Sequence, residues 1–271
     1  MVIETFPQLA SHMDVWIFDA ARGQSTPLTH TLEVEYAPFW FPDKKSVLFR
    51  RFTQEGMRVF SKGIETTDVE REVCEGFGDQ LSRSGRFLML RPAWQSRTNL
   101  AYLSLAGTNR TAIPFPEKLQ GMNDAQWSPD DSLLAYDSNE TRRREVYVIT
   151  FPAFANKTQV SRDGGHYVNW RPDGSELFYL TLDDRTLMSV PVKGDSPLTF
   201  GEPVKVFDVP EGVKLASPSY DVTRDGQRFV MVQTVKTNSS VSSVTKPSAI
   251  LVENWSEEFR EAAGKNGATK R

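Results

Sequence analysis

Short runs of alternating apolar and polar residues follow one another along the chain, and five of them flank a similar turn sequence. The clearest copy, residues 170–174, reads Trp-Arg-Pro-Asp-Gly. Proline fixes φ, aspartate bonds its own downstream backbone, and glycine tolerates positive φ, so each copy predicts a tight turn between two strands. The copies begin at Trp40, Leu81, Trp127, Trp170 and Val222.

Two apolar residues, two positions apart, follow every copy, as one buried face of a strand requires. The pairs are Val47 and Phe49, Leu88 and Leu90, Leu134 and Tyr136, Leu177 and Tyr179, and Phe229 and Met231. Further strands are expected at 57–60, near Val69, and at 145–150, 158–161, 187–192 and 204–207. About four strands in each repeat of roughly 43 residues is the pattern of a β-propeller blade.

The two ends of the chain bear on how many blades there are. Residues 14–19 and 25–29 are predicted as the third and fourth strands of an earlier blade, whose first two strands have no convincing counterpart in residues 1–12. Residues 229–235 and 249–252 are predicted as a second and a third strand. A two-sheet sandwich would also have many short strands, but it predicts no repeated turn.

We therefore predict an all-β fold, a six-bladed β-propeller with four-stranded antiparallel blades. It would form a single domain over residues 1–255, followed by a polar tail over residues 256–271. Five closed blades with loose N-terminal strands are the alternative. A second alternative is that the chain begins inside a blade and was cut from a longer protein.

The composition limits the classes of partner that this chain is expected to bind. A formal net charge of −3 gives no general attraction to nucleic acid or to an anionic membrane surface. No apolar run approaches the ~18 residues of a membrane span, so no membrane insertion is expected. Residues 1–12 lack the pattern of a signal peptide. The sequence does not decide the cellular compartment. An extracytoplasmic location is expected if the chain is a piece of a membrane-anchored parent, and a cytoplasmic one otherwise.

The repeated turn and its following strand resemble the bacterial TolB-type, or WD40-like (PD40), propeller repeat over residues 14–255, with copies at 126–136 and 169–179 near the consensus. The copy at 81 lacks Pro and Asp, and the copy at 222 lacks Trp and Pro. Residues 145–152, 170–179 and 187–192 are also similar to the C-terminal propellers of certain bacterial serine/threonine kinases. That resemblance implies a sensor or interaction domain, and no residue here matches a kinase motif.

The sequence carries no recognisable catalytic or phosphate-binding motif, and its three histidines, His12, His30 and His166, are dispersed. No enzyme activity, no cofactor and no metal site is therefore expected. Asp130-Asp131 and Asp183-Asp184 are typical of turns, with calcium binding as the alternative. The single cysteine, Cys74, excludes an intrachain disulfide and is not expected to act as a nucleophile.

The repeat also locates a candidate binding site. Residues three and four positions before each turn copy should gather at one mouth of the propeller channel. This set mixes aromatic and polar side chains, which suits a peptide or a small ligand. The alternative is that these residues pack against neighbouring loops. The candidates are Tyr36, Phe77, Asn123, Asp124, His166, Tyr167 and Ser219.

Two sets of arginines are further features of the sequence. Residues Arg142-Arg143-Arg144 lie between two predicted strands and are interpreted either as a contact for an acidic partner or phosphate, or as a solvated hairpin tip. Arg50 and Arg91 occupy equivalent positions at the ends of two second strands, which would place them on one side of the disc.

The expected function is a non-catalytic scaffold that binds a protein, a peptide or a small ligand at the channel mouth. The alternative is an accessory or sensor domain detached from a larger enzyme, such as a bacterial membrane serine/threonine kinase or a propeller-gated serine peptidase. A hydrolase or lyase acting in the channel has no supporting residue cluster in the sequence.

Overall fold

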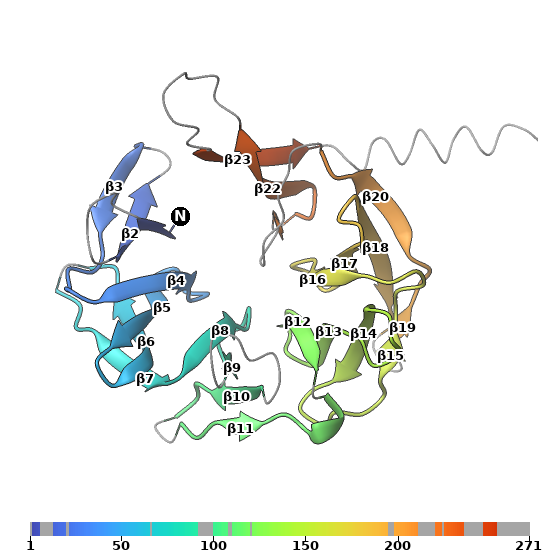
Figure 1. Cartoon of the computed structure of the whole chain (residues 1–271), viewed down its shortest axis with the longest axis horizontal. Helices are drawn as coiled ribbons and strands as arrows, with labels where there is room; N and C mark the ends of the chain where they lie inside the picture. Colours follow the sequence, from blue (N-terminus) through green and yellow to red (C-terminus); the bar gives the residue numbers. More distant parts are fainter. Residues whose placement is uncertain are drawn as a thin grey trace, which may run out of the picture. The chain divides into compact units, whose positions relative to one another are not determined.

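The computed structural model describes residues 2–5, 13–19, 22–65, 67–91, 100–107, 110–119, 121–194, 198–210, 220–223, 225–235 and 246–253. The chain divides into two compact units, Met1–Gly121 and Met122–Arg271, which are described separately (Figure 1). The prediction of a single domain over residues 1–255 stays a prediction. The predicted polar tail, residues 256–271, lies outside the described residues.

The first unit is built of antiparallel sheets whose strands follow chain order (Figure 1). The first sheet contains β1 (Val2–Thr5), β2 (Asp14–Asp19) and β3 (Gln24–Pro27). The second contains β4 (Val34–Trp40), β5 (Ser46–Thr53), β6 (Gly56–Gly63) and β7 (Arg71–Glu75). The third contains β8 (Phe77–Leu81), β9 (Phe87–Arg91), β10 (Ala101–Ser104) and β11 (Ile113–Pro114), and a 3-10 turn, η1 (Glu117–Leu119), follows.

The second unit continues the same organisation. Its first sheet contains β12 (Met122–Trp127), β13 (Leu133–Ser138), β14 (Glu145–Thr150) and β15 (Thr158–Gln159). In the next, β16 (His166–Trp170), β17 (Glu176–Leu180) and β18 (Thr186–Lys193) are followed by β19 (Thr199–Phe200) and β20 (Val204–Asp208), which both pair with β18. The last contains β21 (Tyr220–Val222), β22 (Arg228–Val235) and β23 (Lys246–Glu253).

The predicted turns are confirmed, because every copy lies between the first and second strands of a sheet. In the copy at 170, the backbone N–H of Gly174 donates to the Arg171 carbonyl at 2.9 Å, and Asp173 accepts from the Ser175 backbone at 3.0 Å. Gly174 has a φ of 77°, in the left-handed region that glycine adopts without strain. Lys44 and Asp131 adopt the same conformation where glycine is absent.

Two strand predictions are corrected. The outer strand expected near Val69 is β7, and Val69 itself lies in a loop with 76% of its surface exposed. Val73, four residues later, is the valine that packs in the core. Charged residues flank both valines, so the sequence did not show which of the two is buried. At the N-terminus, β1 pairs with β2 although the sequence offered no convincing candidate, because a four-residue strand is defined by its partner more than by its own pattern.

A bulge recurs on the first strand of four sheets, and the sequence did not reveal it. The pairing register shifts between Tyr36 and Phe39 in β4, and at the equivalent places in β8, β12 and β16. Three bulges hold a non-glycine residue in the left-handed region: Ala37, Asp124 and Tyr167, with φ of 50°, 40° and 53°. Such a bulge bends the strand and re-aims its side chains.

The core of the second unit lies between neighbouring sheets. Trp170 and Leu177 pack with Ala135, Val146 and Val148 of the preceding sheet, and all five are buried. The Trp170 indole N–H also donates to the Gln126 carbonyl at 3.2 Å. Packing of a motif tryptophan between adjacent sheets is therefore confirmed at Trp170.

Cys74 packs beside the buried cluster that contains Leu48, Val59 and Leu88 in the first unit. Burial is the main reason that the pKa of its thiol rises to about 12, with the carboxylates of Glu72 and Glu75 adding to the rise. We expect the folded protein at pH 8 to react with a thiol reagent on the order of a thousandfold more slowly than a free cysteine of pKa about 8.5. Labelling followed by mass spectrometry, with and without denaturant, measures this; equally fast labelling of both states would contradict it.

Candidate functional site

In each sheet, we call the end at which the first strand begins the upper end. The predicted site residues lie at this end. Hairpins between second and third strands also lie there, whereas the repeated turns lie at the opposite, lower end. Tyr36, Phe77, Asn123, Asp124, His166 and Tyr167 all fall at or near the starts of first strands. Ser219 lies outside the described residues.

In the second unit, Arg144 is the centre of a polar network. Its guanidinium donates to both carboxylate oxygens of Asp137, through Nε to Oδ2 and through Nη2 to Oδ1 at 3.1 Å. Nη2 also donates to Asp124 Oδ2 at 2.7 Å, and Nη1 lies 3.0 Å from His166 Nδ1. We call Asp124, Asp137, Arg144, His166 and Tyr167 the Arg144 cluster.

The histidine and the tyrosine complete one side of this cluster. The His166 ring stacks on the Tyr167 ring with centroids 4.2 Å apart, and the Arg144 guanidinium lies 5.7 Å from the Tyr167 centroid. His166 Nε2 lies 2.7 Å from Asp184 Oδ1 and 3.2 Å from the Thr181 carbonyl oxygen. Three residues predicted from the repeat spacing, Asp124, His166 and Tyr167, are thus brought together.

Both sequence interpretations of Arg142–Arg144 need correction at Arg144. Only Arg142 and Arg143 are exposed. Arg144 turns into the sheet, where its side chain is 26% exposed and neutralises acidic groups of its own chain. The reason is Asp137 on β13, whose side chain is fully buried and requires a cation at its side.

The charges of the Arg144 cluster hold one another in place. Burial is the largest influence on Asp137 and raises its pKa, although the bonds from Arg144 oppose the rise. Burial alone would lower the pKa of Arg144, but the bonds and charges of Asp137 and Asp124 raise it. The guanidinium of Arg144 therefore stays charged and can pair with both carboxylates.

The predicted residues of the first unit lie in a different setting. The Tyr36 ring lies 5.5 Å from the Arg50 guanidinium carbon, and its hydroxyl lies 3.5 Å from Met57 Sδ. Phe77 lies opposite Arg91 in the β8–β9 ladder. In the second unit, Asn123 lies opposite Asp137 in the β12–β13 ladder. Arg50 and Arg91 occupy equivalent places, as the repeat spacing predicted.

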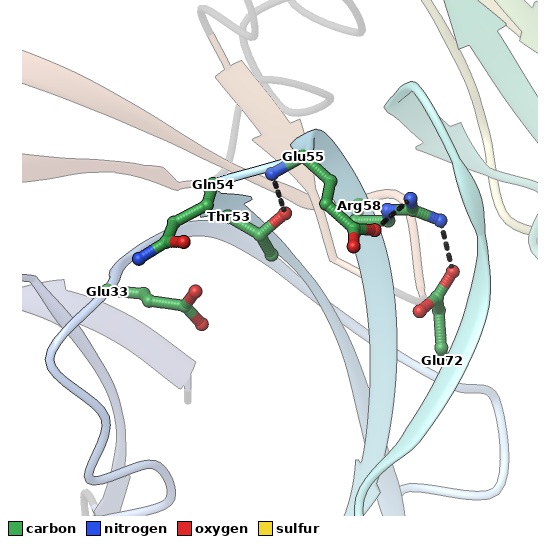
Figure 2. A pocket seen from close by; sticks show the side chains of 6 residues that line it. All are labelled: Glu33, Thr53, Gln54, Glu55, Arg58 and Glu72. Atoms are coloured by element: carbon green, nitrogen blue, oxygen red, sulfur yellow. Dashed lines mark hydrogen bonds and ion pairs between the residues drawn. The ribbon is translucent and has the colours of Figure 1, made fainter.

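A shallow cavity of about 280 Å³ opens at the upper end of the β4–β7 sheet. Figure 2 shows Arg58 between Glu55 and Glu72, with Glu33, Thr53 and Gln54 around the rest of the cavity. Arg58 donates to Glu55 at 2.8 Å and to Glu72 at 2.9 Å. Repeat spacing pointed to the first strand and so missed this cavity, which is lined mainly by residues of the β5–β6 hairpin.

In the part of the chain that the structure describes, neither a group of metal-ligating side chains nor a long apolar helix is present. No three His, Cys, Asp or Glu side chains gather there as metal ligands would. No helix there reaches the length and apolar character that spanning a bilayer demands. The turn residue Asp130 instead accepts bonds from the Ser132 backbone and hydroxyl, at 3.0 and 2.7 Å.

No protein-family model matches the sequence, and no curated protein matches it. Solved structures do match: TolB from Acinetobacter baumannii has a TM-score of 0.63 at 12% identity and aligns with 89% of this chain. The chain spans 57% of that TolB chain. An oligogalacturonate lyase from Vibrio parahaemolyticus gives 0.60 at 13% identity, covering 91% of this chain and 70% of its own.

The β-propeller domain of Cps50 (Swd1) from Myceliophthora thermophila gives a TM-score of 0.59 at 9% identity, covering 89% of this chain and 76% of its own. At such identities the likeness establishes the fold alone, and the matched proteins include both TolB and a lyase. Together with the consecutive antiparallel sheets, these matches show that the chain has the fold of a TolB-like β-propeller.

Proposed function

We propose that this chain is a non-catalytic binding module that holds a protein, a peptide or a small ligand at the upper end of its sheets, with the Arg144 cluster as the contact surface. The observation that supports it most is the convergence of Asp124, His166 and Tyr167 on one partly exposed arginine. If the chain serves a larger enzyme as an accessory domain, the same surface would be its sensing surface.

The Arg144 cluster is suited to recognition because its groups are held before a ligand arrives. Arg144 bonds two carboxylates, and His166 is fixed between Arg144 and the Thr181 carbonyl. Preorganised groups lose little conformational entropy on binding. The stacked His166 and Tyr167 rings add apolar area beside the charges, a combination typical of interface centres.

A triple variant tests this proposal: Asp124→Asn, His166→Gln and Tyr167→Asn, since asparagine tolerates the left-handed conformation at 124 and 167. Ligands are first identified by screening the intact chain against small-molecule and peptide libraries. We expect the triple variant to bind the identified ligand at least about tenfold more weakly, because several polar contacts are lost together.

The matched control is Asp173→Asn, which removes one carboxylate at the lower end of the same sheet. It should bind within about twofold of the unaltered chain, since surface changes away from a site have small effects. Unchanged affinity in the triple variant would exclude the Arg144 cluster as the site. Turnover of an identified ligand by the intact chain would replace binding with catalysis as the function.

A further inference from the structure

Two arginines at the upper end of the first unit share one carboxylate. Arg50 on β5 lies opposite Tyr36, and Arg91 at the end of β9 lies opposite Phe77. The bulge of β8 places Asp79 between them, with Oδ2 at 2.8 Å from Arg91 Nη2 and Oδ1 at 3.6 Å from Arg50 Nη2. The group as a whole therefore carries one positive charge in excess.

The other arginines that the structure describes with buried or half-buried side chains are neutralised more fully. The neighbouring Arg51 contacts the carboxylates of Glu33, Glu35 and Glu70. Arg144 contacts two carboxylates by itself. The pair Arg50 and Arg91 has one carboxylate for two guanidinium groups, which is costly for charges held out of water.

The unmet demand is visible at both arginines. The Arg50 side chain is only 9% exposed, and burial lowers its pKa, with the nearby charge of Arg91 acting in the same direction and Asp79 opposing it. Arg50 donates through Nε to the Gly78 carbonyl and through Nη2 to the Asp79 carbonyl at 3.4 Å, so what it lacks is negative charge rather than acceptors. Arg91 Nε is buried and donates to no acceptor in the described part of the protein.

We propose that Arg50 and Arg91 form a binding site for a carboxylate group, which would contact the partly exposed part of the Arg91 guanidinium. A carboxylate fits because it carries the single negative charge that the site lacks and accepts paired N–H bonds from guanidinium. The Arg91 and Asp79 side chains are 20% and 24% exposed, so a ligand can reach them. The Tyr36 ring beside Arg50 supplies an apolar wall.

The carboxylate can belong to a free small molecule or to the C-terminus of a peptide, since both present the same planar anion. This site lies in the first unit and shares no residue with the Arg144 cluster. A negative result for the carboxylate site would therefore leave the proposed function untouched, and a negative result for the proposed function would leave the carboxylate site untouched.

The test uses NMR on the 15N-labelled full chain, following the Nε–H signals of Arg50 and Arg91 during titration with sodium acetate at constant ionic strength set with sodium chloride. Both signals should shift and saturate, since a bound carboxylate changes the field at each guanidinium. A parallel titration uses N-acetyldiglycine and its amide. Tighter binding of the peptide acid than of acetate, lost on amidation, assigns the site to a peptide terminus; equal binding of the two acids assigns it to the carboxylate group alone.

Three variants decide the outcome. Arg91→Gln should weaken acetate binding at least tenfold, followed at the Arg50 signal. Arg86→Gln is its matched control, because it removes the same charge just before β9, at the other end of that strand. Asp79→Asn should tighten binding several-fold by removing the internal competitor, an effect that damage to the fold would not produce.

The proposal is overturned if chloride alone shifts the signals as acetate does, or if the peptide amide binds as well as the acid. It is also overturned if Arg91→Gln binds acetate as tightly as Arg86→Gln, or if Asp79→Asn weakens binding.

Discussion

Replacing Arg144 with methionine should destabilise the protein by about 3–5 kcal/mol, the cost of leaving a buried charge without its partner. The Asp137 side chain is fully buried, and that of Asp124 is 12% exposed. Arg144 supplies the ion-pair bonds to both. Urea unfolding at neutral pH measures the loss. The control is Arg142→Met, on the same hairpin but exposed, which should change stability by less than about 0.5 kcal/mol.

The loss should depend on pH in a direction that follows from Asp137. Burial already raises the pKa of this carboxyl in the folded protein, and removal of Arg144 would raise it further. The folded variant then binds a proton at pH values where the unfolded chain, with a carboxyl pKa of about 3.9, does not. Stability of the variant therefore falls as pH rises from that value through the folded pKa.

Unfolding at pH 4.5 should consequently show a smaller deficit for Arg144→Met than unfolding at pH 8. The double variant Arg144→Met, Asp137→Leu should recover part of the loss, because the buried charge is removed as well. An equal deficit at both pH values, or a double variant less stable than Arg144→Met, would contradict this account.

Replacing Trp170 with alanine should cost about 3–5 kcal/mol through the lost burial and the cavity left behind. Its side chain is 1% exposed and packs between two neighbouring sheets. Trp170→Phe keeps much of the apolar volume and should lose clearly less, although the bond to the Gln126 carbonyl disappears. Chemical unfolding monitored by far-UV circular dichroism compares the two.

Trp40 offers a matched comparison in the first unit, at the same position of its own turn copy. It is only partly buried against the cluster of Val15, Val47 and Phe49, so Trp40→Ala should be less costly than Trp170→Ala. A loss below about 1 kcal/mol for Trp170→Ala would show that the sheets do not depend on this side chain.

The turns and most strands could be predicted because they depend on local chemistry and on period-two alternation. The bulges could not, because they hold alanine, aspartate and tyrosine at positive φ, where glycine or asparagine is the usual sign. Gly78 holds the equivalent place in β8, where an isolated glycine is a general sign of a bulge, but it does not share the positive φ of the other three.

The positions of three candidate residues, Asp124, His166 and Tyr167, followed from the repeat spacing, but Arg144 at the centre of their cluster did not. Arg144 belongs to a run of three arginines, which is the usual pattern of a solvated loop. The available signal was Asp137, an acid directly after the apolar run of residues 133–136. A buried acid implies a cation from elsewhere in the fold, and sequence alone does not say which one.

The recurring bulge separates two kinds of constraint on this chain. Beyond the bulge, residues such as Trp170 must fit a close-packed interior, and few alternatives are acceptable there. At the bulge the strand is released from strict alternation: the ladder breaks after His166 and resumes at Asn169 and Trp170. The proposed contact surface can therefore change at these positions without repacking the interior around Trp170, provided that the ion pair of Asp124 with Arg144 is kept.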